Sequence, residues 1–167
     1  MAIGTAALHK AIMSIWSTSG LDAAFQALWP SGTETSQFYT LHDQEASPGH
    51  PWPYAVFDQM SVDVTNRMSD DGDGDRREIR ETTFAINIYA REIAGDSRSA
   101  KAIAATLAEE VMKYFGGHPT ESPSSLTLDS GNHLITQFLN EYGDRIGDEE
   151  YRWMIIYSIR TDVPVAN

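Results

Sequence analysis

Apolar residues recur at helical spacing near the N-terminus and predict two helices there. One face of the first helix is formed by Leu8, Ala11, Ile12, Ile15 and Trp16. The Ser-Thr-Ser-Gly segment at residues 17–20 ends this helix. A shorter amphipathic helix is predicted at residues 21–28, before Pro30 and Gly32.

The clearest helical pattern lies at residues 97–115. Four apolar residues follow one another there at intervals of four: Ile103, Leu107, Val111 and Phe115. Ser97 offers a side chain that can cap the start of the helix, and Gly116 with Gly117 supplies a stop. Alanines beside the apolar stripe predict close packing of this helix against a sheet.

Alternating apolar and polar residues predict the long strands. The strongest alternation runs over residues 78–90, and two further strands are predicted at residues 133–144 and 150–162. We expect Pro164 to end the last strand, because proline has no N–H to donate to a ladder.

Apolar residues lie on both faces of the last predicted strand. One face carries Trp153, Ile155, Tyr157 and Ile159. Met154 and Ile156 lie on the other face. Such a strand needs a second cover or a partner, which favours oligomerisation or docking over catalysis.

The segment between the second and third helices predicts shorter elements. A short strand is expected at residues 37–41, and a stiff, extended loop at residues 47–53, which hold three prolines. A strand at residues 53–59 either continues through residues 61–66 or is followed by a separate strand there. Residues 68–77, rich in aspartate and glycine, are typical of a hairpin tip.

The order of these elements predicts the fold class. Strands that follow one another as hairpins, with one long helix crossing between them, indicate an α+β domain. We expect a mostly antiparallel sheet with the crossover helix and the N-terminal helices packed on one face. The length of 167 residues indicates a single domain, residues 1–167.

Composition and charge exclude several classes of function. The chain has no cysteine, which excludes disulfides and thiolate metal sites. Twelve basic and 24 acidic residues give a net charge of −12, which disfavours binding to nucleic acid or to an acidic membrane. No secretion signal or membrane-spanning segment is expected, so the chain should function in the compartment where it is made.

The aspartates of the hairpin tip are the most conspicuous candidate for metal binding. Asp71, Asp73 and Asp75 have the spacing that begins an EF-hand calcium loop. The pattern then fails, because Arg76 takes the place of the required glycine and Thr82 that of the required glutamate. We interpret the segment as a solvated acidic turn, and we expect no metal and no cofactor.

A catalytic dyad is the second chemical possibility. His42 and Asp43 are neighbours, but a histidine beside an aspartate in a loop is more often a surface pair. The five histidines show no metal-ligand spacing such as H-E-x-x-H. We therefore expect no catalytic residue and no enzymatic activity.

Four segments together resemble a known protein family. They are residues 21–25 after the first helix, the Pro-Tyr-apolar strand at residues 53–57, the strand-to-helix passage at residues 84–104 and the strand at residues 152–160. These segments resemble the tail terminator, or tail completion, proteins of long-tailed bacteriophages.

The resemblance implies a structural role in a virion. Such a protein forms a ring of six copies that caps the completed tail tube and docks it to the head-side connector or stopper protein. Its partners would be other copies of itself, the tail tube protein and the connector, with DNA only passing through the channel and no membrane involved. It would occupy the head-proximal end of the tail, after assembly in the host cytoplasm. A negative charge also suits a channel wall that must not bind DNA.

Within that interpretation the hairpin tip supplies the candidate interface residues. Asp70, Asp71, Asp73 and Asp75 are expected to reach a neighbouring subunit or the channel. The candidate charge partners between subunits are Arg76, Arg77, Glu78 and Arg80. The alternative is a solvated tip without a partner.

Two other classes of function remain open at this stage. One is a small ligand-binding or enzymatic α+β domain that uses His42 and Asp43 beside the proline-rich loop. The other is an acidic inhibitor whose carboxylates imitate the phosphates of DNA.

Overall fold

The computed structural model describes residues 5–43, 48–68, 76–129 and 131–165. The helices are α1 (Thr5–Thr18), α2 (Leu21–Gln26), the 3-10 helix η1 (Thr35–Gln37) and α3 (Ala100–Phe115). The strands are β1 (Leu41–His42), β2 (Tyr54–Met68), β3 (Arg76–Arg91), β4 (Asn132–Arg145) and β5 (Glu150–Val165).

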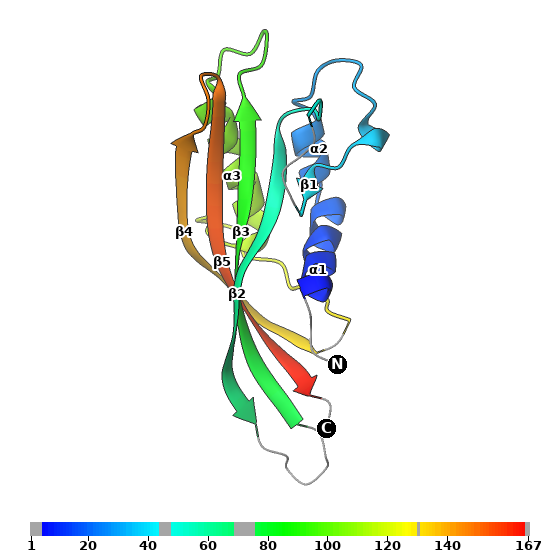
Figure 1. The fold of residues 1–167 in the computed structure, drawn as a ribbon, viewed down its shortest axis with the longest axis vertical. Coiled ribbons are helices and arrows are strands. Elements are labelled where there is room, and N and C mark those ends of the chain that lie inside the picture. The colour runs from blue at the N-terminus through cyan, green and yellow to red at the C-terminus, as the bar shows by residue number, and fades with distance from the viewer. Residues whose placement is uncertain (1–4, 44–47, 69–75, 130, 166–167) are drawn as a thin grey trace.

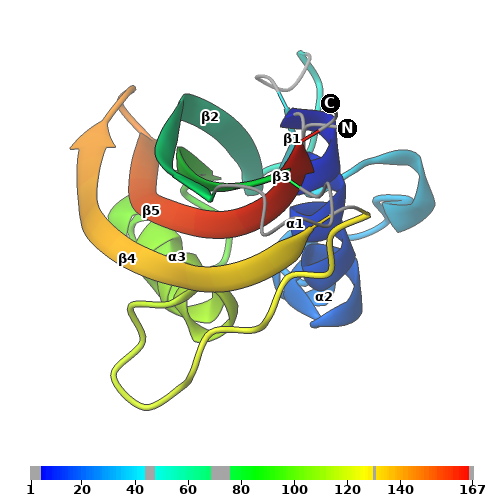
Figure 2. The ribbon, with the colours of Figure 1, turned by 90° about the horizontal axis from the view of Figure 1, so that it is seen from below.

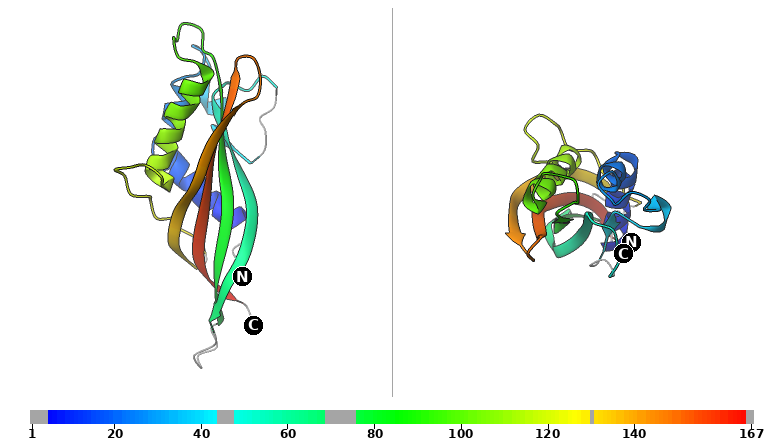
Figure 3. Two further views of the ribbon diagram at one scale, coloured as in Figure 1. Left: turned by 90° about the vertical axis from the view of Figure 1, so that its left-hand side faces the viewer. Right: turned by 90° about the horizontal axis from the view of Figure 1, so that it is seen from above.

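The five strands form one sheet in the order β1-β2-β3-β5-β4. All neighbouring strands are antiparallel except β1, which runs parallel to β2 over two residue pairs. The α-helices lie on one face of the sheet, as the side view in Figure 3 shows. This arrangement confirms the α+β class with a mostly antiparallel sheet and a crossover helix between β3 and β4.

The core lies between the helices and the covered face of the sheet. In its centre the ring of Phe84 stacks on that of Tyr157, with 5.4 Å between the ring centroids. The Tyr157 hydroxyl donates a hydrogen bond of 2.8 Å to the carbonyl of Gly116, where α3 ends. Burial raises the pKa of Tyr157, so this hydroxyl keeps its proton and remains a donor.

A buried threonine connects the N-terminal helices to the sheet. Trp16 of α1 donates its indole N–H to the hydroxyl of Thr40 over 2.8 Å. That hydroxyl in turn donates to the carboxylate of Asp22 in α2. Because Thr40 directly precedes β1, and its carbonyl accepts from the backbone N–H of Ala55 in β2, this chain of bonds fixes both helices against the edge of the sheet.

The sheet extends well beyond the helices. Helix α3 has 16 residues and is about 24 Å long, whereas β3, also of 16 residues, is about 53 Å long. The far ends of β2, β3 and β5 therefore continue as a twisted, curved ribbon past the helices (Figures 1 and 2). We call the part of β2 from Gln59 to Met68 the β2 extension.

Three sequence predictions are wrong in detail. The strand expected at residues 37–41 is mostly irregular, because Gln37 ends the helix η1 and β1 begins only at Leu41. Ser99 caps α3 in place of Ser97, since its hydroxyl accepts the N–H of Ala102 over 3.2 Å. Pro164 does not end β5. The pairing of β4 with β5 stops at Asp162, so at Pro164 no strand lies on that side of β5 to accept an N–H.

The other elements agree with the prediction. The strand expected at residues 53–59 begins one residue later, at Tyr54, and continues through residues 61–66 as one strand, β2. The second helix ends two residues earlier than expected, at Gln26. The structure describes the proline-rich loop at residues 47–53 from Pro48 onward, and this part lies between β1 and β2.

The cap of α3 gives a direct test of this geometry. Ser99→Ala removes the acceptor for the N–H of Ala102 and should lower the free energy of unfolding by about 1 kcal/mol. Ser97→Ala is the matched control and should leave it nearly unchanged. Urea unfolding of the two variants measures the difference, and equal effects would show that Ser99 is not the cap.

Candidate functional site

Both outer strands of the sheet have an open edge. Among the described residues, β4 pairs with β5 and with no other strand. The other edge is formed by β2, which β1 covers only at Ala55 and Val56. Within the described part of the chain, no strand pairs with the outer side of the β2 extension, so its backbone groups there are available to another strand.

The open edges carry most of the large apolar side chains that are exposed. On the β2 extension these are Met60, Val62 and Val64, with exposed fractions of 45 to 56%. On β4 and just after it they are Leu134, Ile135, Leu139, Tyr142 and Ile146, with 41 to 51% exposed. Edge strands of monomeric proteins usually carry charges instead, so these edges are suited to burial against a partner.

Each open edge also carries two bulges. The pairing of β2 with β3 skips one residue between Gln59 and Ser61 and another between Val64 and Asn66. The pairing of β4 with β5 skips Leu134 and Leu139. Bulges bend a strand and turn the skipped residue out of the ladder. Three of the exposed apolar residues, Met60, Leu134 and Leu139, occupy such positions.

The face of the sheet that the helices leave uncovered is rich in ion pairs, and it also carries a small apolar cluster of Tyr54, Val56 and Tyr89. Alternation along the strands places residues such as Ser158 and Arg160 there, opposite to the buried Tyr157. Four arginines of this face pair with carboxylates at 2.8 to 3.1 Å: Arg77 with Asp162, Arg91 with Glu150, Arg152 with Asp144 and Arg160 with Glu81. Hydrogen bonds from Ser158 and Arg160 lower the pKa of Glu81, which keeps this carboxylate charged.

The candidate charge partners lie at the start of β3, and Arg77, Glu78 and Arg80 form ion pairs within the chain. Arg77 binds Asp162 of β5 through its Nε at 2.8 Å. Arg80 and Glu78 pair at 3.1 Å and are both largely shielded from solvent. Arg76 is the first residue of β3. The tip aspartates Asp70, Asp71, Asp73 and Asp75 lie outside the described residues.

The structure pairs His42 with a different residue from the one expected. Its Nε2 lies 3.0 Å from Nε2 of His50, whose Nδ1 lies 2.6 Å from the carbonyl of Pro51. His50 Nε2 also lies 2.9 Å from the carbonyl of Tyr39. The histidine pair therefore connects the proline-rich loop to the segment before β1, which is a structural role. Burial, and then the neighbouring His50, lower the pKa of His42.

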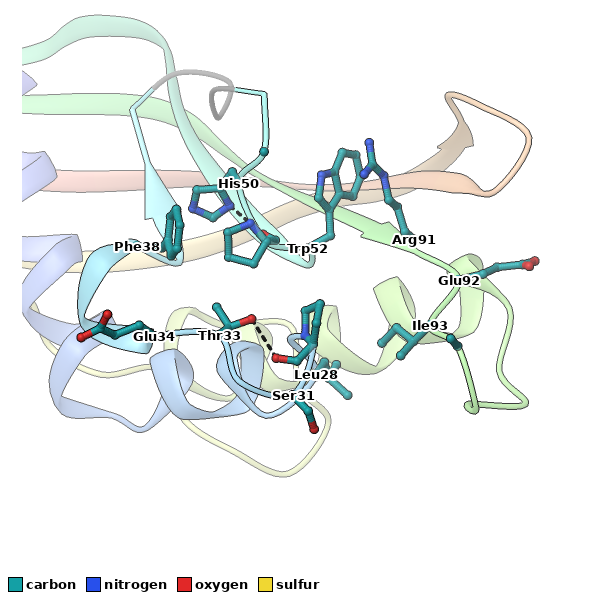
Figure 4. Close-up of a pocket in the computed structure, with 14 residues that line it drawn as sticks. Leu28, Ser31, Thr33, Glu34, Phe38, His50, Trp52, Arg91, Glu92 and Ile93 are labelled. Atoms are coloured by element: carbon teal, nitrogen blue, oxygen red, sulfur yellow. Dashed lines mark hydrogen bonds between the residues drawn. The ribbon is translucent and has the colours of Figure 1, made fainter.

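An open groove of about 820 Å³ lies at the end of the sheet opposite the β2 extension (Figure 4). Its walls come from the segment after α2, the proline-rich loop and the residues that follow β3, including Phe38, Trp52 and Ile93. The guanidinium of Arg91 lies over the Trp52 ring, 3.9 Å from its centroid, and also binds Glu150. The groove's aromatic and cationic groups thus already interact with each other or with neighbouring residues.

The described residues contain neither a cluster of metal ligands nor a membrane-spanning helix. No three His, Asp or Glu side chains in this part of the chain come together as metal ligands would. No helix in the same part is long and apolar enough to cross a membrane.

The apolar edges were not found from the sequence. The sequence pointed instead to Met154 and Ile156. Both lie on the uncovered face of β5, an interior strand of the sheet, and both are partly buried there. The usable signal was the run Met60-Ser61-Val62-Asp63-Val64, whose alternation continues beyond the segment that the helices cover. The exposed apolar residues of β4 had no comparable signal.

Comparison with known proteins identifies a likeness of fold. No protein-family model and no curated protein sequence matches the chain. Among solved structures, a chain from the virion of a native gene transfer agent (GTA) particle is similar, with a TM-score of 0.50 and 18% sequence identity. The match covers 91% of this chain and 91% of the other. The two proteins share their fold, and the likeness extends over nearly the whole of each.

The two half-buried histidines predict how stability depends on pH. Burial lowers the pKa of His42 and of His133 below the ordinary value of 6.5. The unfolded chain then binds more protons than the folded one, so stability should fall as pH decreases through 6.5. Urea unfolding at pH 7.5 and pH 5.0 measures this loss. His42→Gln combined with His133→Gln should reduce it, and an unchanged loss would contradict the assignment.

Proposed function

We propose that this chain is a structural virion protein, a tail terminator that forms a ring of six copies. The ring caps the tail tube and docks it to the head-side connector. The observation that carries the proposal is the pair of open, apolar edges on opposite sides of one sheet. Such a subunit has two different surfaces for its neighbours, which is what a closed ring of identical chains requires.

The likeness of fold supports the same class of protein. The similar chain belongs to a virion of a native gene transfer agent particle, and it matches this chain over most of its length. The sequence segments that resemble tail terminators give the finer assignment. Those segments include parts of α2 and α3 as well as the start of β2 and most of β5, so the resemblance extends over both the helices and the sheet.

The charges of the sheet favour an arrangement with the uncovered face toward the channel. The helices would then lie outside. The arginines described above are each bound to a carboxylate, and the whole chain has a net charge of −12. Such a wall offers phosphates little positive charge, so DNA would pass through without being held.

The hairpin tip has a docking role in this proposal. The ion pair of Arg77 with Asp162 connects β3 to β5 at the residues that follow the tip in the sequence. Asp70, Asp71, Asp73 and Asp75 would meet a neighbouring copy or the channel. Because Arg77 and Arg80 have carboxylate partners within the chain, we favour support of the sheet over direct bonds between subunits for these two arginines.

The groove favours a second candidate, a ligand-binding or enzymatic domain. A groove of about 820 Å³ has the size of a small-molecule site. Against this, His50 directs its ring nitrogens at two backbone carbonyls, and Arg91 is bound by Trp52 and Glu150. These groups hold the loops together, which leaves the assembly proposal better supported.

The ring is tested directly by measuring the mass of the assembled protein. Mass photometry and electron microscopy should show rings of six copies, either for the purified chain alone or after co-expression with a tail tube protein from the same genome. With tubes present, the rings should lie at one end of each tube. A chain that stays monomeric under both conditions would contradict the proposal.

The tip is tested by shortening it. Deletion of residues 70–75 should weaken the docking of rings to tubes or connectors by about tenfold or more. A variant of unchanged length, with the tip aspartates replaced by asparagine, separates the effect of charge from that of reach. Circular dichroism melting checks that both variants fold. Unchanged ring formation and docking after the deletion would count against a role for the tip.

A further inference from the structure

The directions of the strands allow the sheet to continue from one copy to the next. Across the sheet, β2, β3, β5 and β4 alternate in direction, so β4 runs antiparallel to β2. When a second copy is placed beside the first without being turned over, its β2 meets the open edge of β4. The two strands then run in opposite directions, as antiparallel pairing requires.

The apolar segments of the two edges lie at the same level of the sheet. We call two residues level when the pairing of β2 with β3, β3 with β5 and β5 with β4 connects them. By this definition Val62 is level with Thr136, and Ser61 is level with Gln137. In the same way, Asp63 is level with Ile135. The apolar run of β2 is therefore level with the exposed apolar residues of β4, with Val62 on the helix side of the sheet and Ile135 on the uncovered face. A copy displaced sideways places these two segments next to each other in one ladder.

The bulges of the two edges are also level with each other. The skipped residues are five positions apart in β2, at 60 and 65, and five apart in β4, at 134 and 139. Traced through the pairing, each bulge of β2 lies within about one residue of the level of a bulge in β4. Both edges therefore bend at the same places, which makes them complementary in shape.

We propose, resting on the ring described above, that β4 of each copy pairs with the β2 extension of the next copy. The partner is a second copy of this chain, and the contact is an antiparallel ladder that joins the sheets into one. In this register Val62 of one copy lies beside Thr136 of its neighbour and Asp63 lies beside Ile135, so the ladder partly covers both exposed apolar segments.

Pairing between like edges explains the structure less well. Two β4 edges related by a twofold axis would cover the apolar residues of β4 and leave those of β2 exposed. Two β2 edges would do the reverse. Pairing of β4 with β2 covers both segments with one contact, and repetition of that contact generates a ring.

Cysteine cross-linking tests the register, because the chain has no cysteine of its own. Ser61→Cys and Gln137→Cys place thiols on the same face at the same level of the two edges, and both side chains are exposed. Within one chain the two positions are separated by β3 and β5, a distance of about 14 Å. That distance is too long for a disulfide, so any bond must join two copies.

The double variant, oxidised at high protein concentration, should give a ladder of covalent oligomers on a non-reducing gel. A mixture of the two single variants should give dimers that contain one chain of each kind. The matched control is Ser61→Cys with Tyr142→Cys, because Tyr142 is exposed but level with Val56, where β1 occupies the edge. It should give no ladder.

Four other results would contradict the pairing of β4 with the β2 extension. Dimers from Gln137→Cys alone would show that β4 pairs with itself, and an equal ladder from the control would exclude this register. Rings that form without a disulfide between residues 61 and 137 would remove the edge contact but keep the proposed function. A chain that forms no oligomer in any condition would remove both.

Charged substitutions test the apolar contribution. Val62→Lys and Ile135→Asp place a charge on an exposed position of each edge, so the isolated subunit should keep its melting temperature. Ile135→Asp also sets a second carboxylate opposite Asp63 of the neighbouring copy in the proposed register. Each variant should weaken association at least tenfold in analytical ultracentrifugation. Tyr39→Lys is the control, since Tyr39 is 73% exposed and lies outside both β4 and the β2 extension. Equal effects of all three variants would contradict the proposal.

Discussion

Burial of one face of the sheet beneath three helices is the constraint on which the structure depends. Phe84 and Tyr157 stack at its centre, and Thr40 connects Trp16 and Asp22 to the edge. The helices are about half as long as the strands, so this burial stabilises only part of the sheet. The remaining length depends on the ladder itself and on ion pairs such as that of Arg77 with Asp162. An extension supported in this way gains stability when another surface covers it.

The fold could be predicted from the sequence because its long elements have strong periodic patterns. The apolar stripe of α3 and the alternation of β3 each fix an element by local spacing alone. The errors arose where local patterns were ambiguous. Ser97 and Ser99 are both suitable caps, and only the backbone geometry selects Ser99. Pro164 is compatible with β5 because β4 has already ended there, which depends on the position of a distant strand.

The candidate site was harder to predict, because it too depends on contacts between distant parts of the chain. Whether a strand has an open edge depends on the order of strands in the sheet, and that order is set by contacts between distant parts of the chain. The apolar second face of β5 led to the prediction of a partner at that strand. The structure places β5 between β3 and β4, however, and the exposed apolar residues lie on β2 and β4. The pairing of His42 with His50 instead of Asp43 likewise depends on the path of the proline-rich loop.

The two-residue strand β1 has a consequence for how copies stack beside one another. It occupies the outer side of β2 at Ala55 and Val56, and in the proposed register Tyr142 and Gly143 of the neighbouring β4 come level with those two residues. In the proposed ring the end of β4 must therefore diverge from β2 where β1 begins, so that residues 132–138 alone pair with the β2 extension. Because β1 blocks the outer side of β2 near the groove, it would also limit how far each subunit of the ring can be offset in that direction.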